Sequence, residues 1–179
     1  MRGHGLKYQS VLFPNGMFAG LFGTSASHND LGVLNMSGLA HYLEDILHPE
    51  YTMEGGILPA LYGDAIFQSE NYSTIVARYD LVGTDEEIEL YRKLNYRMSG
   101  VRQSIEHMYG QLFNLFRLLK TPRQHQIFRG GDSAYRLGIV CFFIVNCYTC
   151  FNGSPCNSMF DSTPPTIESY LPLDEDLQP

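Results

Sequence analysis

Three acidic residues stand at positions where carboxylates often take part in metal-ion chemistry. Asp64 directly follows an apolar run and a glycine, and carboxylates at the ends of strands are frequent in the active sites of open α/β sheets. Glu106 lies within a segment of helical periodicity, and Asp30 ends a polar segment. Hard cations such as Mg²⁺ bind carboxylate oxygens, and two such ions can cleave a phosphodiester bond. The three acids together predict a divalent metal site.

Each acid also has an ordinary structural interpretation. Asp64 could simply form a turn, and Asp30 could cap a helix. Glu106 could form a surface ion pair with Arg102, which precedes it by four residues and shares its helix face. Gly110 follows Glu106 by four, and a glycine inside a helix costs about 1 kcal/mol. A bound metal or phosphate would use the space beside that glycine, whereas close helix–helix packing is the ordinary alternative.

The charge distribution separates a basic segment from an acidic average. The formal net charge is −7, which argues against a uniformly basic nucleic-acid binder. All lysines and arginines except Arg2 and Lys7 lie between Arg78 and Arg136. This segment is the candidate DNA surface, with phosphate contacts expected from Arg92, Lys93, Arg97, Arg102, Arg117, Lys120, Arg123 and Arg129. The alternative is a solvated helix face, because Glu86, Glu87 and Glu89 dilute the positive charge.

The apolar run Leu137–Phe151 contains three of the four cysteines. A membrane-spanning helix needs roughly 20 residues, so we interpret this run, interrupted by Asn146, as a buried helix and expect no membrane association. Cys147 and Cys150 form a C-x-x-C pair, which is compatible with zinc or redox chemistry. The sequence holds no second such pair and no paired histidines, and buried cysteines behave as small apolar residues. We therefore assign the cysteines to the core.

The first half of the chain predicts a hairpin, a helix and strands. Tyr8–Phe13 and Met17–Phe22 have β-type composition and flank Pro14-Asn15-Gly16, and Asn-Gly between such runs is a strong hairpin signal. A polar loop is expected over Gly23–Asp30 and a helix over Ser37–Leu47, followed by a buried strand at Ile57–Tyr62 that ends at Gly63-Asp64. Ile75–Tyr79 is expected to be extended.

Helices dominate the second half. Thr84 with Glu87 resembles a capping box that opens a helix to about Met98, and Gly100 is expected to break or kink it. A second helix follows helical spacing over Val101–Leu119, and a last one covers Asp132–Phe151. The sequence therefore predicts an α/β fold with one partial domain, 1–153, and an acidic, disordered tail, 154–179.

These segments, taken in order, resemble the DDE nuclease domain of PIF/Harbinger transposases. The segment "LKYQSVLFPNGMFAGLFG", followed by "HND" and "SGL", is similar to the hairpin and acidic loop of that family. "LYGDAIF" resembles its strand with a Gly-Asp pair, and "YRMSGVRQSIEHMYGQLFNLFRLL" resembles its helix with R-x-x-x-E-x-x-x-G. "IVCFFIVNCYTCFNG" is similar to its closing helix. The resemblance covers about Leu6 to Gly153.

The resemblance implies an RNase H-like fold and a metal-dependent endonuclease that cuts DNA and joins the 3′ end to target DNA. Asp64 and Glu106 would be the second and third catalytic acids, and Asp30 a further metal ligand. Arg102 would lie near Glu106. The implied cofactor is Mg²⁺ or Mn²⁺, the implied partners are DNA and a separate DNA-binding protein, and the implied location is the nucleus. Oligomeric state is not predicted.

The chain also departs from the family pattern. The first catalytic aspartate of the family lies on a strand before the hairpin, and this hairpin begins at Tyr8, so we expect that strand and its aspartate to be missing. The acidic loop, Ser25-Ala26-Ser27-His28-Asn29-Asp30, lacks the arginines that are usual in the family. The chain alone is therefore expected to be inactive, and the alternative function is a non-catalytic transposon remnant or a domesticated DNA- or protein-binding module.

Overall fold

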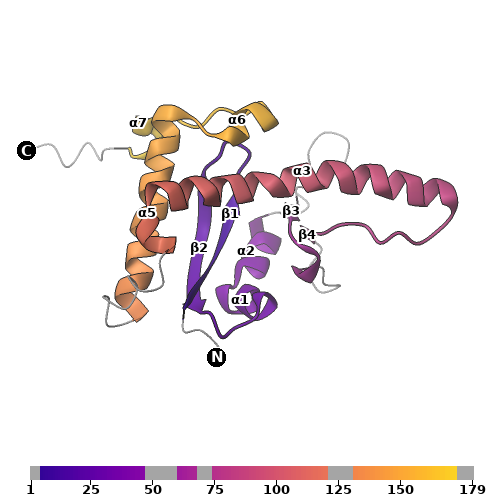
Figure 1. Cartoon of the computed structure of the whole chain (residues 1–179), viewed down its shortest axis with the longest axis horizontal. Coiled ribbons are helices and arrows are strands. Elements are labelled where there is room, and N and C mark those ends of the chain that lie inside the picture. The colour runs from indigo at the N-terminus through magenta and orange to yellow at the C-terminus, as the bar shows by residue number, and fades with distance from the viewer. Residues whose placement is uncertain (1–4, 47–59, 68–73, 121–130, 173–179) are drawn as a thin grey trace, which may run out of the picture. The chain divides into compact units, whose positions relative to one another are not determined.

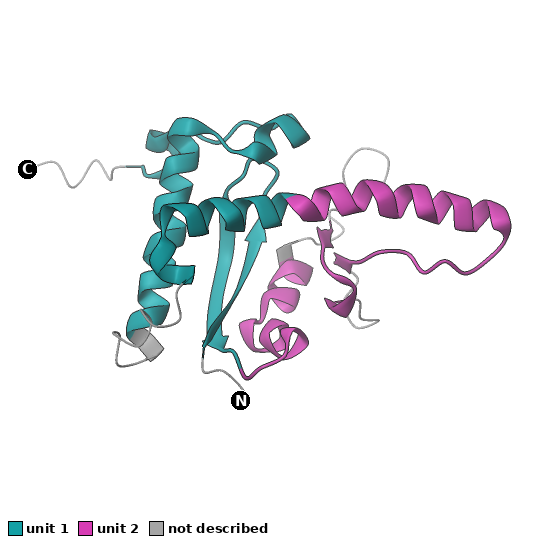
Figure 2. Cartoon of the chain, viewed as in Figure 1, with its two compact units in different colours: residues 1–26, 104–179 teal, residues 27–103 magenta. Residues whose placement is uncertain are grey.

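The computed structural model describes residues 5–46, 60–67, 74–120 and 131–172 (Figure 1). These residues form helices and two small sheets, so the coarse prediction of a mixed α/β chain is confirmed. The chain divides into two compact units (Figure 2). Unit 1 contains Met1–Ala26 and Ser104–Pro179, and unit 2 contains Ser27–Gln103.

The predicted hairpin is present in unit 1. Strand β1, Leu6–Leu12, pairs antiparallel with β2, Phe18–Ser25. The turn between them closes where the Gly16 amide donates to the Phe13 carbonyl at 2.9 Å, and Gly16 has a positive φ of 80°, which glycine adopts without steric cost. β2 continues to Ser25, so pairing extends into part of the predicted polar loop.

The predicted last helix, α5, spans Gly131–Asn152 and contacts both strands of the hairpin. One side of α5 packs into a core with the hairpin and the second half of helix α3, Asp85–Leu115. The buried residues of this core are Phe18, Met108, Leu112, Cys141, Phe142, Val145 and Cys156. In the described part of the chain, Ser133–Asn152 is the one helix long and apolar enough to cross a membrane, with a mean hydropathy of 1.5. This apolar helix is longer than the apolar run Leu137–Phe151 on which the sequence-based expectation depended.

Asn146, which interrupts the apolar sequence of α5, pairs with the backbone of β2. Its Oδ1 accepts from the Phe18 amide at 2.8 Å, and its Nδ2 donates to the Phe18 carbonyl at 2.8 Å. The side chain therefore satisfies one residue of β2 in the way that a neighbouring strand would. The same Nδ2 also lies 3.0 Å from the Tyr170 hydroxyl.

The segment after Gly153 is ordered as far as Pro172, which corrects the predicted disordered tail over that range. Helix α6, Pro155–Phe160, begins at a capping box formed by Ser154 and Asn157. Helix α7, Ile167–Tyr170, contacts α5, where the Tyr170 and Phe143 rings stack with centroids 6.2 Å apart. The polar composition of this segment did not indicate the helix caps or the contact that Tyr170 makes with α5. Residues 173–179 lie outside the described part.

Unit 2 contains helices and a short parallel sheet. Helix α1, Asp30–Ser37, was not predicted; the Asn29 side chain caps it by accepting from the Gly32 amide at 2.7 Å. Gly38, with a φ of 65°, ends it. The predicted helix follows as α2, Leu39–Ile46. Strand β3, Leu61–Tyr62, precedes the 3-10 turn η2, Ala65–Phe67, and pairs with β4, Ile75–Val76. Ile57–Pro59 of the predicted strand lie outside the described residues.

The two helices predicted around Gly100 are one continuous helix, α3, over Asp85–Leu115. The predicted break at Gly100 was wrong because a single glycine costs only about 1 kcal/mol, and the surrounding residues contain no proline and include many good helix formers. A 3-10 turn, η3, follows over Arg117–Lys120.

The predicted capping box of α3 is confirmed. The Thr84 amide donates to Glu87 Oε2 at 2.7 Å, and the Glu87 amide donates to Thr84 Oγ1 at 3.4 Å. The hydrogen bonds from the Thr84 backbone and side chain hold the pKa of the Glu87 carboxyl below its ordinary value of 4.5.

The lowered pKa predicts how this cap depends on pH. A depressed carboxyl pKa contributes stability that is present above pH 4.5 and is lost as the pH falls through the lowered value. Thr84→Ala should therefore lower the thermal midpoint at pH 7, and this effect should decrease as the pH is lowered through 4.5 and below. An effect that stays constant over this range would show that the charged form of Glu87 plays no part in the cap.

Candidate metal and nucleic-acid site

Asp64 lies at the end of β3, as the sequence predicted. The residue is exposed, its Oδ1 accepts from the Ala65 amide at 2.8 Å, and its carbonyl accepts from the Phe67 amide at 2.8 Å. Asp64 thus opens η2 in the manner of a helix cap. One carboxylate oxygen has this local role, and the exposed carboxylate has room for a cation or water.

Asp30 is the first residue of α1 and is half-buried. The cap of this helix is Asn29, so the ordinary interpretation of Asp30 as the helix cap is wrong. An acid in the first turn is favoured by the helix dipole. Helix α1 packs against η2, and Leu34 and Phe67 belong to one apolar cluster. The two elements that begin next to Asp30 and Asp64 are therefore in contact.

Glu106 lies on α3 in unit 1, and both Glu106 and the adjacent His107 are exposed. The neighbouring positions Ser104 and Met108 are buried, so the carboxylate belongs to the solvent side of an amphipathic helix. Asp30 and Asp64 belong to unit 2. In the part of the chain that the structure describes, no group of three or more His, Cys, Asp and Glu side chains could hold a metal ion. The donor chemistry of the three acids suits Mg²⁺ or Mn²⁺.

The glycines of α3 leave open space on the helix surface. A Cβ atom added at Gly110 would meet no atom within 4 Å, and the same holds at Gly100. Close packing within the described chain therefore does not explain either glycine, and that ordinary interpretation of Gly110 is wrong for these residues. A helix that contains two unfavourable glycines without an internal packing reason fits a surface that is approached closely from outside.

The basic residues proposed to contact DNA are exposed. Arg97, Arg102, Arg117 and Lys120 all lie on α3 or η3. Arg92 and Lys93 lie 3.8 Å and 3.7 Å from Glu89 carboxylate oxygens, which offsets part of their charge, as expected. Arg123 and Arg129 lie outside the described residues.

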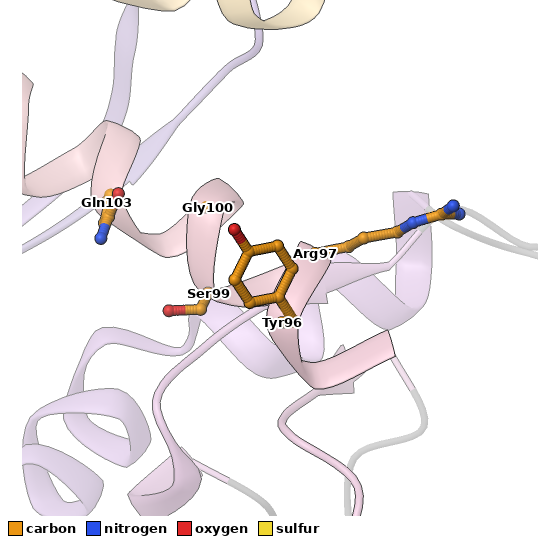
Figure 3. Close-up of a pocket in the computed structure, with 5 residues that line it drawn as sticks. All are labelled: Tyr96, Arg97, Ser99, Gly100 and Gln103. Carbon is orange, nitrogen blue, oxygen red and sulfur yellow. The ribbon is translucent and has the colours of Figure 1, made fainter. Parts of the chain in front are cut away.

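Arg97 also lines a shallow pocket on α3 that the sequence analysis did not identify. Figure 3 shows its lining residues, all within unit 2: Tyr96, Arg97, Ser99, Gly100 and Gln103. Tyr96, Ser99, Gly100 and Gln103 are separated by three or four residues, so these four share a helix face. The expected break at Gly100 concealed this grouping, because it placed Gln103 on a different helix.

The cysteines do not form a metal site in the described structure. Cys141 and Cys156 are 2% and 1% exposed, and all four cysteines are free thiols. Burial raises the pKa of the Cys141 and Cys156 thiols. Burial, together with the neighbouring Cys147, also raises the pKa of Cys150. Raised pKa values oppose the thiolate form that binds metals. The predicted core role is confirmed for the buried Cys141 and Cys156, whereas Cys147 and Cys150 are half-buried.

Comparison with known proteins adds no relative to this picture. No family model, no curated protein and no solved structure matches the chain. The assignment of a function therefore depends on the acids, glycines and basic residues described above and on the resemblance of the sequence motifs.

Proposed function

We propose that the chain is a DNA-binding nuclease domain of the PIF/Harbinger transposase type with an RNase H-like fold. Asp64 and Glu106 would be catalytic acids, and Asp30 a further metal ligand. Two features support the proposal. Asp64 directly precedes η2, which packs against α1, the helix that begins at Asp30. Glu106 stands on the exposed side of a long helix. By itself the chain is expected to bind DNA and metal without efficient cleavage.

The open space at Gly110 is the single observation that best supports a nucleic-acid ligand. Gly110 follows Glu106 by four residues, so both lie on one side of α3, and nothing in the described chain fills the position of its missing Cβ. A phosphate that approaches the helix backbone beside a carboxylate-bound cation needs such space. Arg102, four residues before Glu106 on the exposed side of α3, supplies a positive charge close to the same position.

The acidic and the basic residues would have different roles in the proposed function. Mg²⁺ or Mn²⁺, when bound, would activate water and stabilise the oxygen that leaves in phosphodiester cleavage. Asp30, Asp64 and Glu106 would hold the ions through carboxylate oxygens. The exposed cations Arg97, Arg102, Arg117 and Lys120 would contact DNA phosphates without reading sequence, and DNA affinity should therefore fall steeply with salt. Nuclear location follows from the DNA substrate, and a separate DNA-binding protein would supply sequence specificity.

The second candidate function is a non-catalytic module derived from such a transposase. The loop Ser25–Asp30 favours it, because this loop lacks the arginines that are usual in the family. Under this alternative, the basic residues of α3 and η3 still bind DNA, but divalent metal has no effect on that binding. DNA affinity measured with and without Mn²⁺ distinguishes the two candidates.

Substitution of Gly110 tests the nucleic-acid surface. Gly110→Ala should raise the free energy of unfolding by about 0.5–1 kcal/mol, because alanine favours the helix and its Cβ meets no atom. The same change should weaken binding of duplex DNA several-fold in fluorescence anisotropy, because the methyl group occupies the space that a phosphate needs.

A size series at this position separates helix stability from ligand access. Alanine and leucine have similar helix propensities, so Gly110→Leu should leave stability close to that of Gly110→Ala and weaken DNA binding further. If neither substitution changes DNA affinity while both stabilise the helix, DNA does not approach α3 at Gly110.

A further inference from the structure

Helix α5 has an apolar side that faces away from the core. Its buried positions, among them Cys141, Val145 and Thr149, share one side with the hairpin contacts. The opposite side carries exposed apolar residues that recur at intervals of three and four, as on one face of a helix. We call these residues, together with the half-buried Cys147 between them, the outer face of α5; they are Val140, Phe143, Ile144, Cys147 and Phe151.

The outer face is too exposed and too apolar for an ordinary solvated helix. Val140 is 50% exposed, Ile144 43% and Phe151 71%. The sequence has no charged residue from Leu137 to Phe151, so the outer face offers nothing to an acidic or basic partner. Burial of an apolar surface of this kind against another apolar surface is favourable at roughly 25 cal/mol per Å².

The face is large enough for a weak contact between two copies. Its large side chains, Val140, Phe143, Ile144 and Phe151, are 50%, 42%, 43% and 71% exposed. With roughly 200 Å² for a fully covered side chain of this size, their exposed parts amount to about 400 Å² per copy. Two copies would therefore bury about 800 Å² in total, which is the size of a weak, transient contact rather than of an obligate dimer.

The spacing of large and small residues fits an antiparallel pair of identical helices. With a two-fold axis between Val145 and Asn146, Val140 of one copy faces Phe151 of the other, and Ile144 faces Cys147. Both pairs place a small side chain opposite a larger one, which allows helices to pack 8–10 Å apart. A two-fold interface of this kind is self-complementary because each contact occurs twice.

We propose that the outer face of α5 binds the outer face of a second copy of this chain, with the two helices antiparallel. The contact uses a different helix from the one that carries Glu106 and the basic residues. The proposed dimer therefore does not depend on the proposed DNA-binding function. If both proposals are correct, each dimer carries two DNA-binding surfaces.

Sedimentation equilibrium of the full chain tests the dimer. The wild-type chain should show a weak monomer–dimer equilibrium at concentrations below millimolar. Ile144→Glu should weaken association at least tenfold, because each dimer would bury two unpaired charges. Met159→Glu is the matched control, since Met159 is 43% exposed on α6 in the same unit, and it should leave the equilibrium unchanged. A wild-type chain that stays monomeric up to millimolar concentration overturns the proposal.

Cross-linking tests the register. Val140→Cys/Phe151→Cys, made in a Cys147→Ser/Cys150→Ser background, should give disulfide-linked dimers under mild oxidation. Within one helix the two positions are about 16 Å apart, too far for an internal disulfide. Dimers from Val140→Cys alone in that background would indicate parallel helices and contradict the proposed pairing.

A lipid surface is the other possible occupant, because the helix is long and apolar enough to cross a membrane. Flotation with phosphatidylcholine vesicles separates the two. Wild-type chain that floats with the vesicles as a monomer, while Ile144→Glu does not, would replace the dimer by a membrane contact. Wild-type chain that stays with the soluble fraction and sediments as a dimer supports the proposal.

Discussion

Replacing Asn146 with alanine should lower the free energy of unfolding of unit 1 by about 2–5 kcal/mol. The side chain is 6% exposed and pairs with both the amide and the carbonyl of Phe18 at 2.8 Å. Alanine leaves both buried backbone groups without this partner, and each unsatisfied group costs about 1–3 kcal/mol. The cavity left by the amide adds to the loss.

Urea unfolding of Asn146→Ala beside Asn152→Ala measures this loss against a matched change. Asn152 lies on the same helix, but its hydrogen bond to the Tyr148 carbonyl is exposed, so its replacement should cost less than about 0.5 kcal/mol. Tyr170→Phe removes only the hydroxyl that Asn146 contacts and should cost about 1 kcal/mol. Similar losses for Asn146→Ala and Asn152→Ala would contradict the role assigned to the Phe18 pairing.

Local signals in the sequence predicted the elements that depend on neighbouring residues. The Asn15-Gly16 turn, the Thr84 cap and the apolar run that became α5 are each determined within a few residues, and each is present. Helix α1 was missed because its cap, Asn29, stands inside a polar segment with little apolar periodicity. The order after Gly153 was missed because it depends on a distant contact, between Tyr170 and Asn146.

The candidate site was predictable only in part, for the same physical reason. The position of each acid on its own element follows from local sequence: Asp64 at a strand end, Asp30 at a helix start and Glu106 on a helix. The contact between α1 and η2 is not local, because it joins segments separated by about thirty residues through the cluster that contains Leu34. The shared helix face of Tyr96 and Gln103 was not predicted, because a break in the helix was expected at Gly100, between them.

Asp64→Ala/Glu106→Ala should abolish saturable Mn²⁺ binding. Both carboxylates are exposed, so their removal should leave the fold intact, within about 0.5 kcal/mol for surface positions. Mn²⁺ prefers oxygen ligands such as carboxylates, and only Asp30 of the three proposed ligands would remain. A single carboxylate holds a divalent ion too weakly to give saturable binding at millimolar concentration.

The most direct test of the proposed function is calorimetric titration of the folded chain with Mn²⁺. The wild type should give saturable heat, Asp64→Ala/Glu106→Ala should give none, and the matched control Asp80→Ala/Glu86→Ala, which removes two other exposed acids, should bind as the wild type does. Circular dichroism should show that all three chains are folded. Equal binding by the wild type and the Asp64→Ala/Glu106→Ala variant, or no binding by a folded wild type, would contradict the proposed metal centre.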